Sequence, residues 1–429
     1  MIHAILAASI VAASVSILAA EPPEYQPVPA KLSHARDGLG NVFAKLNAGE
    51  DVKIAYFGGS ITAAGGWRVQ TLKWLQQTYP DAKVSEINAA IGGTGSNLGV
   101  FRFGQDVLKH KPDLIFVEFS VNDGGAPPDR IWQAMDGIVR QAWRADPTID
   151  ICYVYTFRVG YEKDLDQGLC PRAAGADEML AEYYGIPSIN MALHTAEMAR
   201  EGKLVFTPPK DAEGNAAPTP EGVMLFSRDG VHPLTEAHQM YTDIIAAALK
   251  QMEPDATPGA HTLKAPFVED NWEKAKMVPL EPEMLSSGWR KLSPDEGLGK
   301  RFNHFMPELW EATEPGEEIA FKFKGTYASL YDLVGPDGGQ LVATIDGETA
   351  GPRPRFDKYC TYHRIATFGI RSGLEDAVHE VSVRIHPEQP DRSSVVDREK
   401  TKPNFDPAKY DGTRVRVAAL MLIGDVVRD

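Results

Sequence analysis

The chain has 429 residues, which is long for a single hydrophobic core and predicts two domains. Its formal net charge is −15 at pH 7, which argues against a nucleic-acid partner, because such a partner requires a basic footprint. The three cysteines, Cys152, Cys170 and Cys360, cannot all pair within one chain. We therefore expect no disulfide framework and no cysteine metal site, and Cys152, inside an apolar run, is expected to be a buried free thiol.

The N-terminus has the pattern of a targeting segment. Residues 1–20 contain no Asp, Glu, Lys or Arg, and residues 4–20 form a nearly continuous apolar run that ends in Ala19-Ala20. This predicts a signal peptide over 1–20 and hence a secreted or periplasmic protein. The positive n-region is weak and Leu18 occupies the −3 position, so an uncleaved N-terminal anchor stays open as an alternative. No other stretch approaches membrane-spanning length.

Residues 30–253 alternate between short apolar runs and helical patterns, which predicts a parallel sheet covered by helices on both faces. The expected strands are 52–55, 84–87, 113–119, 151–157 and 187–191. The expected helices are 32–46, 67–79, 130–145, 176–184, 192–201 and 235–252. The segment 208–221 is rich in Pro, Gly and Ala without periodicity, and it predicts a lid over the carboxyl ends of the strands.

Three loops at those carboxyl ends carry polar residues. Ser60 follows the first strand and two glycines, where open α/β sheets place their ligands. Taken alone, this stretch favours a helix N-cap over a nucleophile. The second loop, 92–99, contains four glycines but lacks the Gly-Lys-Ser/Thr ending of a nucleotide-binding loop. Asn122 lies in the third loop, after the strand 113–119.

Asp229 and His232 lie three residues apart, just before Pro233 and the last helix of this region. At this spacing the carboxylate can orient the imidazole while the other ring nitrogen faces a nucleophile, as in serine hydrolases. The sequence around Ser60 differs from the G-x-S-x-G elbow of α/β-hydrolases, because the second glycine is missing.

From about residue 52 to 252 the chain resembles the SGNH (GDSL-type) esterase superfamily. The four sequence blocks of that family are carried, in the family's order, by Gly59-Ser60, Gly93, Asn122-Asp123 and Asp229-Gly230-Val231-His232. Two positions depart from the family pattern. Gly59 stands where the name-giving motif has Asp, and Ser120 stands where a Gly usually precedes the Asn by two residues.

The resemblance implies a flavodoxin-like, three-layer α/β/α fold and an ester hydrolase without cofactor or metal. It implies Ser60 as nucleophile, His232 as base and Asp229 as the group that orients the base. It also implies an oxyanion hole formed by the backbone N–H groups of Ser60 and Gly93 and the side-chain amide of Asn122.

Each of these residues also has an ordinary structural interpretation. Asn122 alone is typical of a turn, and His232 alone of a residue that caps or packs at a helix start. His238 is a rival base. Arg102, after the glycine-rich loop, is a weak candidate for substrate binding, with a structural ion pair as its alternative.

Residues 260–429 tend to alternate at period two between Gly, Pro and Asp turns, which predicts an all-β sandwich or jelly-roll domain. The expected strands include 319–323, 329–333, 341–345, 378–385 and 415–427. A candidate sugar-stacking surface consists of Trp289, Trp310, Tyr359 and Tyr362, although aromatic residues in such a domain more often belong to the core.

Together these patterns predict a serine esterase that removes small acyl groups, O-acetyl above all, from a glycan. The alternatives are a lipase or thioesterase for longer acyl chains, and a non-catalytic carbohydrate-binding protein. For the second domain two roles stay open. It either tethers the enzyme to its polymer, so that a chain truncated near Ala256 keeps activity on small esters, or it packs on the first domain and covers an apolar face.

Overall fold

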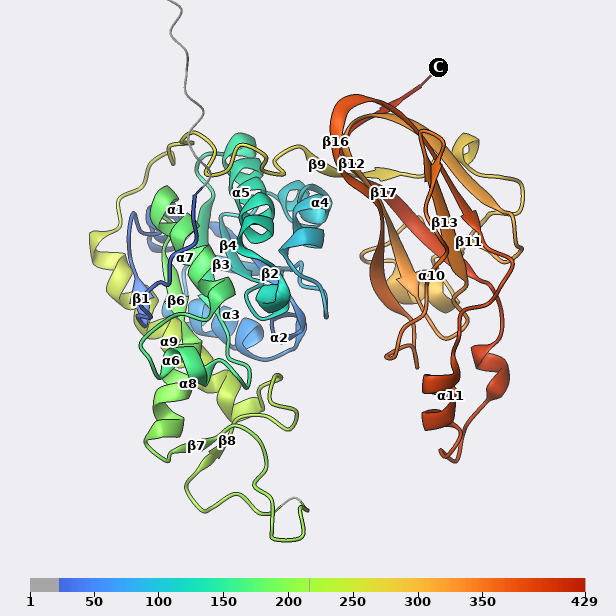
Figure 1. The fold of residues 1–429 in the computed structure, drawn as a ribbon. Helices are drawn as coiled ribbons and strands as arrows, with labels where there is room; N and C mark the ends of the chain where they lie inside the picture. The colour runs from blue at the N-terminus through green and yellow to red at the C-terminus, as the bar shows by residue number, and fades with distance from the viewer. Residues whose placement is uncertain (1–22, 216, 429) are drawn as a thin grey trace, which may run out of the picture.

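The structure is a computed structural model that describes residues 23–215 and 217–428. The predicted signal peptide therefore lies outside the described residues. Among the described residues, no helix has both the length and the apolar character needed to cross a membrane. A domain of helices around a sheet is followed by a domain of β-strands (Figure 1).

The sheet of the first domain has the strand order β1-β6-β5-β4-β2-β3. Its strands are β1 (Ser33–His34), β2 (Asp51–Gly58), β3 (Lys83–Asn88), β4 (Leu114–Glu118), β5 (Asp150–Tyr155) and β6 (Ser188–Asn190). All neighbours pair in parallel except β1, which adds antiparallel to the edge strand β6. The predicted parallel sheet is thus confirmed. The chain order reverses between β2 and β4, and a crevice outside the carboxyl ends at such a point is where α/β sheets bind ligands.

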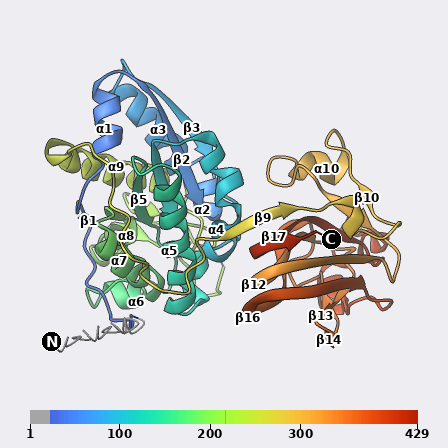
Figure 2. The same cartoon turned by 90° about the horizontal axis from the view of Figure 1, so that it is seen from above.

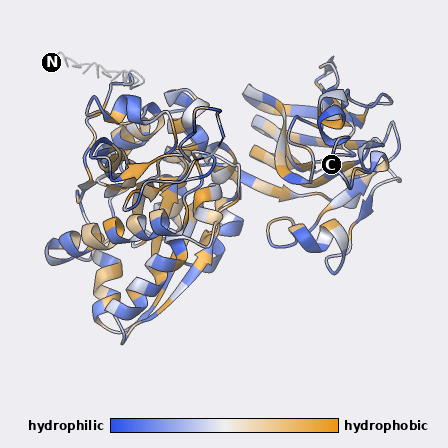
Figure 3. Cartoon of the chain, turned by 90° about the horizontal axis from the view of Figure 1, so that it is seen from below, coloured by the Kyte–Doolittle hydropathy of each residue, from blue (hydrophilic) through white to orange (hydrophobic). Residues whose placement is uncertain are grey.

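Helices cover both faces of this sheet (Figure 2). They are α1 (Gly40–Asn47), α2 (Ser60–Ala63), α3 (Trp67–Thr78), α4 (Ser96–Asp106), α5 (Pro128–Ala145), α6 (Glu162–Leu165), α7 (Arg172–Tyr184), α8 (Met191–Arg200) and α9 (Thr235–Met252). Side chains alternate along each strand. Ile54 and Tyr56 of β2 belong to a core with α1, α3, α8 and α9, whereas Ala55 and Phe57 belong to a core with α4, α5 and α7. The helices that cover the sheet contain both hydrophilic and hydrophobic residues (Figure 3).

Two predictions for this domain were wrong in detail. The expected helix 32–46 begins only at Gly40, because residues 33–34 instead pair with the open edge of β6. Helix α4 was not predicted, because its glycines resemble a loop. Gly99 lies inside this helix, where a Cβ would come within 2.9 Å of the Phe119 ring, so the glycine serves close packing rather than a turn.

The second domain consists of antiparallel ladders, as predicted. Its elements are β9 (Ala275–Pro279), β10 (Arg290–Lys291), α10 (Gly297–Phe302), β11 (Trp310–Ala312), β12 (Glu318–Val334), β13 (Gln340–Ile345), β14 (Glu348–Thr349), β15 (Arg353–Pro354), β16 (Arg364–Ile385), α11 (Ser393–Glu399) and β17 (Val415–Val427). The two expected strands 319–323 and 329–333 form one strand, β12, whose register shifts after Gly325. Hydrogen bonds join all of these strands into one sheet, so the two packed layers of a sandwich stay a prediction.

The two domains share a hydrophobic core. Phe101 of α4 packs on Trp272 and Tyr327, with ring centroids 5.6 and 5.0 Å apart. The backbone N–H of Trp272 donates to the carbonyl of Gln133 in α5 at 2.8 Å. Buried residues of β9, β12 and β17 continue the same apolar cluster. Two roles were left open for the second domain, and the structure shows the second of them, packing against the first domain.

Candidate active site

Ser60 is the first residue of the short helix α2, directly after β2. Gly59, not Ser60, is the N-cap, and no side chain caps this helix, so the N-cap interpretation of Ser60 was wrong. The Ser60 hydroxyl instead lies 2.8 Å from Nε2 of His232. This hydrogen bond joins the start of the parallel sheet to the segment before α9, 172 residues later in the chain.

Asp229 holds the opposite side of the His232 ring. Its Oδ2 lies 2.7 Å from Nδ1 of His232, and its Oδ1 accepts the backbone N–H groups of Val231 and His232 at 2.9 Å each and the Ser227 hydroxyl at 2.8 Å. Partial burial raises the pKa of Asp229, but these hydrogen bonds, that of the His232 ring foremost, outweigh it and hold the pKa well below its usual value. The carboxylate stays ionised and fixes the orientation of the imidazole.

Gly93 and Asn122 approach Ser60 from the loops after β3 and β4. Gly93 has a φ of +75°, a conformation that favours glycine, and a Cβ there would meet open space. Within the described part of the chain, neither its N–H nor the Asn122 side-chain amide has an acceptor. Both residues line one cleft of about 1280 Å³ together with Ser60 and His232. Two free donors next to a serine are what an oxyanion requires, so their predicted role fits this geometry.

The contact between Gly59 and Asn122 explains one departure from the family pattern. A Cβ on Gly59 would lie 1.9 Å from Oδ1 of Asn122, far inside van der Waals contact. Any other residue at 59, including the Asp of the name-giving motif, would displace the Asn122 amide from its present position. The sequence alone gave no reason for this glycine.

Comparison with known proteins gives a family match for the first domain. Residues 56–240 match the family model described as "GDSL-like Lipase/Acylhydrolase family". The N-terminal domain is a GDSL-like lipase/acylhydrolase domain. No curated protein matches the chain.

Two solved structures share the two-domain fold over most of the chain. One, "a two-domain esterase (CEX) active on acetylated mannans", superposes with a TM-score of 0.70 at 20% identity, over 94% of this chain and 100% of that chain. Another, described as the same esterase "co-crystallized with mannopentaose", gives a TM-score of 0.68 at 20% identity, over 90% of this chain and 94% of that chain. The two-domain fold of this chain therefore occurs in at least one other protein.

Two buried carboxyl groups support the loops of the lipase/acylhydrolase domain, and sequence reasoning gave them no role. Glu118 ends β4 and accepts the hydroxyls of Thr62 and Thr156 at 2.9 Å each. Burial raises its pKa to about 7, although these hydrogen bonds oppose the shift. Asp123 accepts the N–H of Ser96 at 3.1 Å and so fixes the glycine-rich loop at the start of α4, and burial raises its pKa to about 6. In the sequence, both residues could have been recognised as carboxylates that lie at the end of an apolar strand or in the loop that follows it.

His238 and Arg102 lie away from the cleft. The His238 ring is buried, and its Nδ1 accepts the N–H of Trp67 at 3.1 Å. Burial, with a smaller contribution from His232, lowers its pKa to about 4, and its contacts are those of a packing residue rather than a base. Arg102 has no exposed surface and pairs with Asp106 at 3.0 Å. The suggestion that Arg102 contacts substrate was therefore wrong, because a fully buried guanidinium cannot reach a ligand in the cleft.

The β-domain forms the second wall of the cleft. Tyr359 and Tyr362, 59% and 50% exposed, line the same cavity as Ser60. The other two aromatic residues of the predicted sugar-stacking surface, Trp289 and Trp310, instead pack with the core of the β-domain. The predicted lid is not part of this site either, because no described residue of 208–221 lines the cleft.

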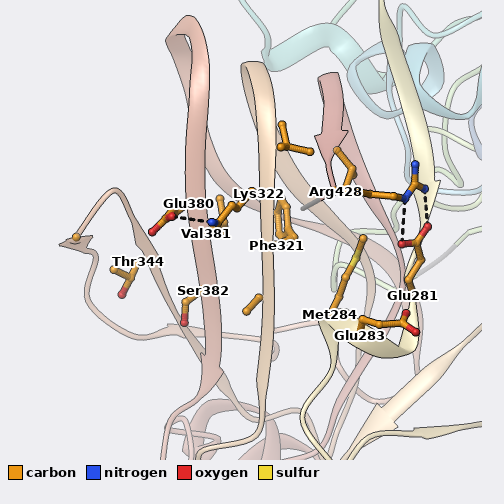
Figure 4. Close-up of a pocket in the computed structure, with 14 residues that line it drawn as sticks. Glu281, Glu283, Met284, Phe321, Lys322, Thr344, Glu380, Val381, Ser382 and Arg428 are labelled. Carbon is orange, nitrogen blue, oxygen red and sulfur yellow. Dashed lines mark hydrogen bonds and ion pairs between the residues drawn. The ribbon is translucent and has the colours of Figure 1, made fainter.

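A second cavity, of about 860 Å³, lies on the sheet of the β-domain (Figure 4). Phe321, Met284 and Val381 contribute its apolar surface. Four of its five charged residues form ion pairs with one another, Arg428 with Glu281 at 2.6 Å and Lys322 with Glu380 at 3.2 Å. No residue of the Ser60 site lines it.

Proposed function

We propose that this protein is a serine esterase that removes small acyl groups, acetyl above all, from a polysaccharide bound between its two domains. The proposal is supported above all by the two hydrogen bonds that join Ser60 to His232 and His232 to Asp229. Ser60 and His232 line a cleft that also contains the free N–H donors and the exposed tyrosines. The GDSL-like family of the first domain supports the same reaction class.

The proposed chemistry follows from the positions of the atoms. The Ser60 oxygen attacks the ester carbonyl while His232 Nε2 takes its proton. The N–H groups of Ser60 and Gly93 and the Asn122 amide stabilise the oxyanion that forms. His232⁺, stabilised by the ionised Asp229, then gives its proton to the sugar oxygen as the bond between that oxygen and the acyl carbon breaks, so that the sugar leaves as a free hydroxyl. Water, activated by the same histidine, hydrolyses the acyl-enzyme and restores Ser60.

A glycan substrate is supported by the second wall of the cleft. Tyr359 and Tyr362 are among the few large apolar residues that are well exposed in the described chain, and exposed aromatic rings beside an active site suit the faces of sugar rings. A two-domain esterase of the same fold is described as active on acetylated mannans, which fits a glycan ester here. Together with the N-terminal segment 1–20, this favours a secreted or periplasmic enzyme.

The lipase or thioesterase alternative fits the cleft less well. A long acyl chain requires a continuous apolar surface, whereas this cleft carries five Lys and Arg residues along its walls. A non-catalytic carbohydrate-binding protein would not need the preserved geometry of Ser60, His232 and Asp229.

The test is acetate release by the full chain from acetylated glycans, compared with release of acyl groups from 4-nitrophenyl esters of two to twelve carbons. We expect hydrolysis of the acetyl ester, with rates that fall as the acyl chain lengthens, and release of acetate from at least one acetylated polysaccharide. Faster hydrolysis of the long-chain esters would favour the lipase alternative, and no hydrolysis of any ester would contradict the proposal.

A further inference from the structure

The cleft is basic although the protein as a whole is acidic. Its lining contains five Lys and Arg residues and one carboxylate, in a chain whose formal net charge is −15. The cations are Arg158, Arg301, Arg364, Arg398 and Lys402, and the carboxylate is Glu399. A cleft lined by one sign of charge concentrates ligands of the opposite sign. This contrast between site and surface is not explained by hydrolysis of a neutral ester.

Three of these five cations have structural partners. Arg364 pairs with Asp357 at 2.5 Å, and Arg398 and Lys402 both pair with Glu399, at 3.3 and 2.9 Å. These pairs hold the segments around Tyr359 and α11, and the two carboxylates, Asp357 and Glu399, compensate two of the three positive charges.

Arg158 and Arg301 differ from the other three. Both are exposed, and neither has a carboxylate within ion-pair distance in the part of the chain that the structure describes. Each guanidinium lies 5.3 Å from the ring of a neighbouring aromatic residue, Tyr161 for Arg158 and Phe302 for Arg301. Such stacking orients a guanidinium while leaving its N–H donors available.

The two arginines come from opposite walls of the cleft. Arg158 follows β5, and the N–H of the next residue, Val159, donates to the carbonyl of Gly230 in the Asp229–His232 loop at 2.7 Å. Arg301 belongs to α10 of the β-domain, and the nearby His304 contacts the carbonyl of Asn88, beside the glycine-rich loop, at 3.5 Å. Both arginines are thus held next to segments that carry the Ser60 site.

We propose that the polysaccharide bound at this site is anionic, and that Arg158 and Arg301 bind its carboxylate or sulfate groups while Ser60 attacks an acyl ester on the same chain. This inference rests on the proposed esterase function and narrows its substrate class. The planar guanidinium offers paired donors to either anion, so the shared requirement is a negatively charged glycan. Uronate carboxylates and sulfate esters are the two sources of that charge, and the experiment separates them.

The experiment compares matched polymers. Acetylated polygalacturonate is compared with the same polymer after methyl esterification of its carboxylates, and an acetylated sulfated galactan with its desulfated form. Acetate release by the full chain is measured at 20 mM and 500 mM NaCl. We expect kcat/KM to be at least about tenfold higher for a charged polymer than for its neutral partner at low salt, with the difference shrinking at high salt. The pair that shows the preference identifies the anion.

Two substitutions locate the preference. Arg158→Gln and Arg301→Gln should each lower the ratio of charged to neutral kcat/KM by about tenfold, because each removes a charge-assisted contact. Arg371→Gln is the matched control, since Arg371 lies on β16 outside the cleft and pairs with Glu348. It should leave the ratio at the wild-type value.

Binding gives a readout that does not depend on turnover. Ser60→Ala protein should bind the charged polymer more tightly than the neutral one in a calorimetric titration. Equal or weaker binding and equal rates for the charged polymers would overturn the inference, as would an unchanged ratio in both cleft variants. Absence of any acetate release, including from 4-nitrophenyl acetate, would contradict the esterase proposal, whereas the binding comparison would still decide whether the site selects anions.

Discussion

Two large cavities in the described part of the chain, the cleft at Ser60 and the pocket of the β-domain, differ in whether their polar groups have partners. In the pocket of the β-domain, four of the five charged side chains neutralise one another in the pairs Arg428–Glu281 and Lys322–Glu380. In the cleft between the domains, Gly93 and Asn122 have donors without acceptors among the described residues, and the hydrogen-bonded pair Ser60 and His232 lines the same cavity. The volumes are of similar order, so size does not separate a structural cavity from a site. A site is distinguished instead by hydrogen-bonding groups that lack partners and converge on one point.

The largest expected effect follows from removing the proposed nucleophile. Ser60→Ala should lower kcat for acetyl ester hydrolysis by at least about 10⁴-fold, because the covalent route is lost while binding remains. Thermal unfolding should change little, since Ser60 is only partly buried at the start of a short helix. Ser382→Ala, in the pocket of the β-domain, is the matched control and should keep wild-type activity. Substantial turnover by the Ser60 variant would remove the distinction between the two cavities.

A smaller loss is expected at the oxyanion donors. Asn122→Ala should lower kcat about 10²- to 10³-fold with little change in KM, because its amide acts on charge that develops only in the transition state. Gly59→Ala should act in the same direction by displacing the Asn122 amide. Gly65→Ala is a suitable control, since a Cβ there meets open space. Equal activity of Gly59→Ala and Gly65→Ala would show that hydrolysis does not depend on the present position of the Asn122 amide.

The tyrosines of the second wall should affect polymer binding moderately. Tyr359→Ala and Tyr362→Ala should each raise KM for an acetylated polysaccharide about three- to tenfold, which corresponds to the loss of one stacking contact. The change for 4-nitrophenyl acetate should be smaller, because a small ester does not extend along the β-domain. Val378→Ala removes an exposed apolar side chain of the same domain outside the cleft and serves as the reference. Equal losses on polymer and small ester would argue that the tyrosines act through folding.

The smallest expected effect concerns stability and pH. Burial raises the pKa of Glu118 from 4.5 to about 7. The contribution of protonated Glu118 to the free energy of unfolding is therefore fully present below about pH 4.5 and is lost as the pH rises through about 7. That loss is on the order of 3 kcal/mol. Glu118→Gln cannot ionise, so its unfolding free energy should fall less than that of the wild type between pH 4.5 and 8. Urea titrations at several pH values measure this difference, and parallel curves for the two proteins would contradict it.

Local sequence predicted most of the first domain, because its strands and helices carry strong periodic patterns. Helix α9 begins and ends at the predicted residues 235 and 252. The order of Ser60, Gly93, Asn122, Asp229 and His232 along the chain also led to their placement around one cleft. Other features of the site depend on packing between segments that are distant in the chain, and local sequence patterns do not show them. The collision that fixes Gly59 involves Asn122, and the complete burial of Arg102 depends on where α4 packs.

The role of the second domain was the largest uncertainty at the level of sequence. Period-two patterns predicted its strands, but nothing in them indicates that Arg301, Tyr359 and Tyr362 line the same cleft as Ser60, from which they are separated by more than 200 residues in the chain. The shared core around Phe101, Trp272 and Tyr327 brings them there. A tethered module would leave these aromatic rings exposed. For this reason, a chain truncated near Ala256 should lose solubility rather than only its activity on polymers.

The central claim, that Ser60 is a nucleophile activated by His232 within the cleft, is tested most directly by covalent labelling. The full chain is incubated with a 4-nitrophenyl phosphonate, which phosphonylates activated serines, and is then analysed by intact mass and peptide mapping. We expect one adduct, on the peptide that contains Ser60, loss of esterase activity in proportion to labelling, and no adduct in His232→Ala protein. An adduct on another residue, or esterase activity that survives complete labelling of Ser60, would contradict the central claim.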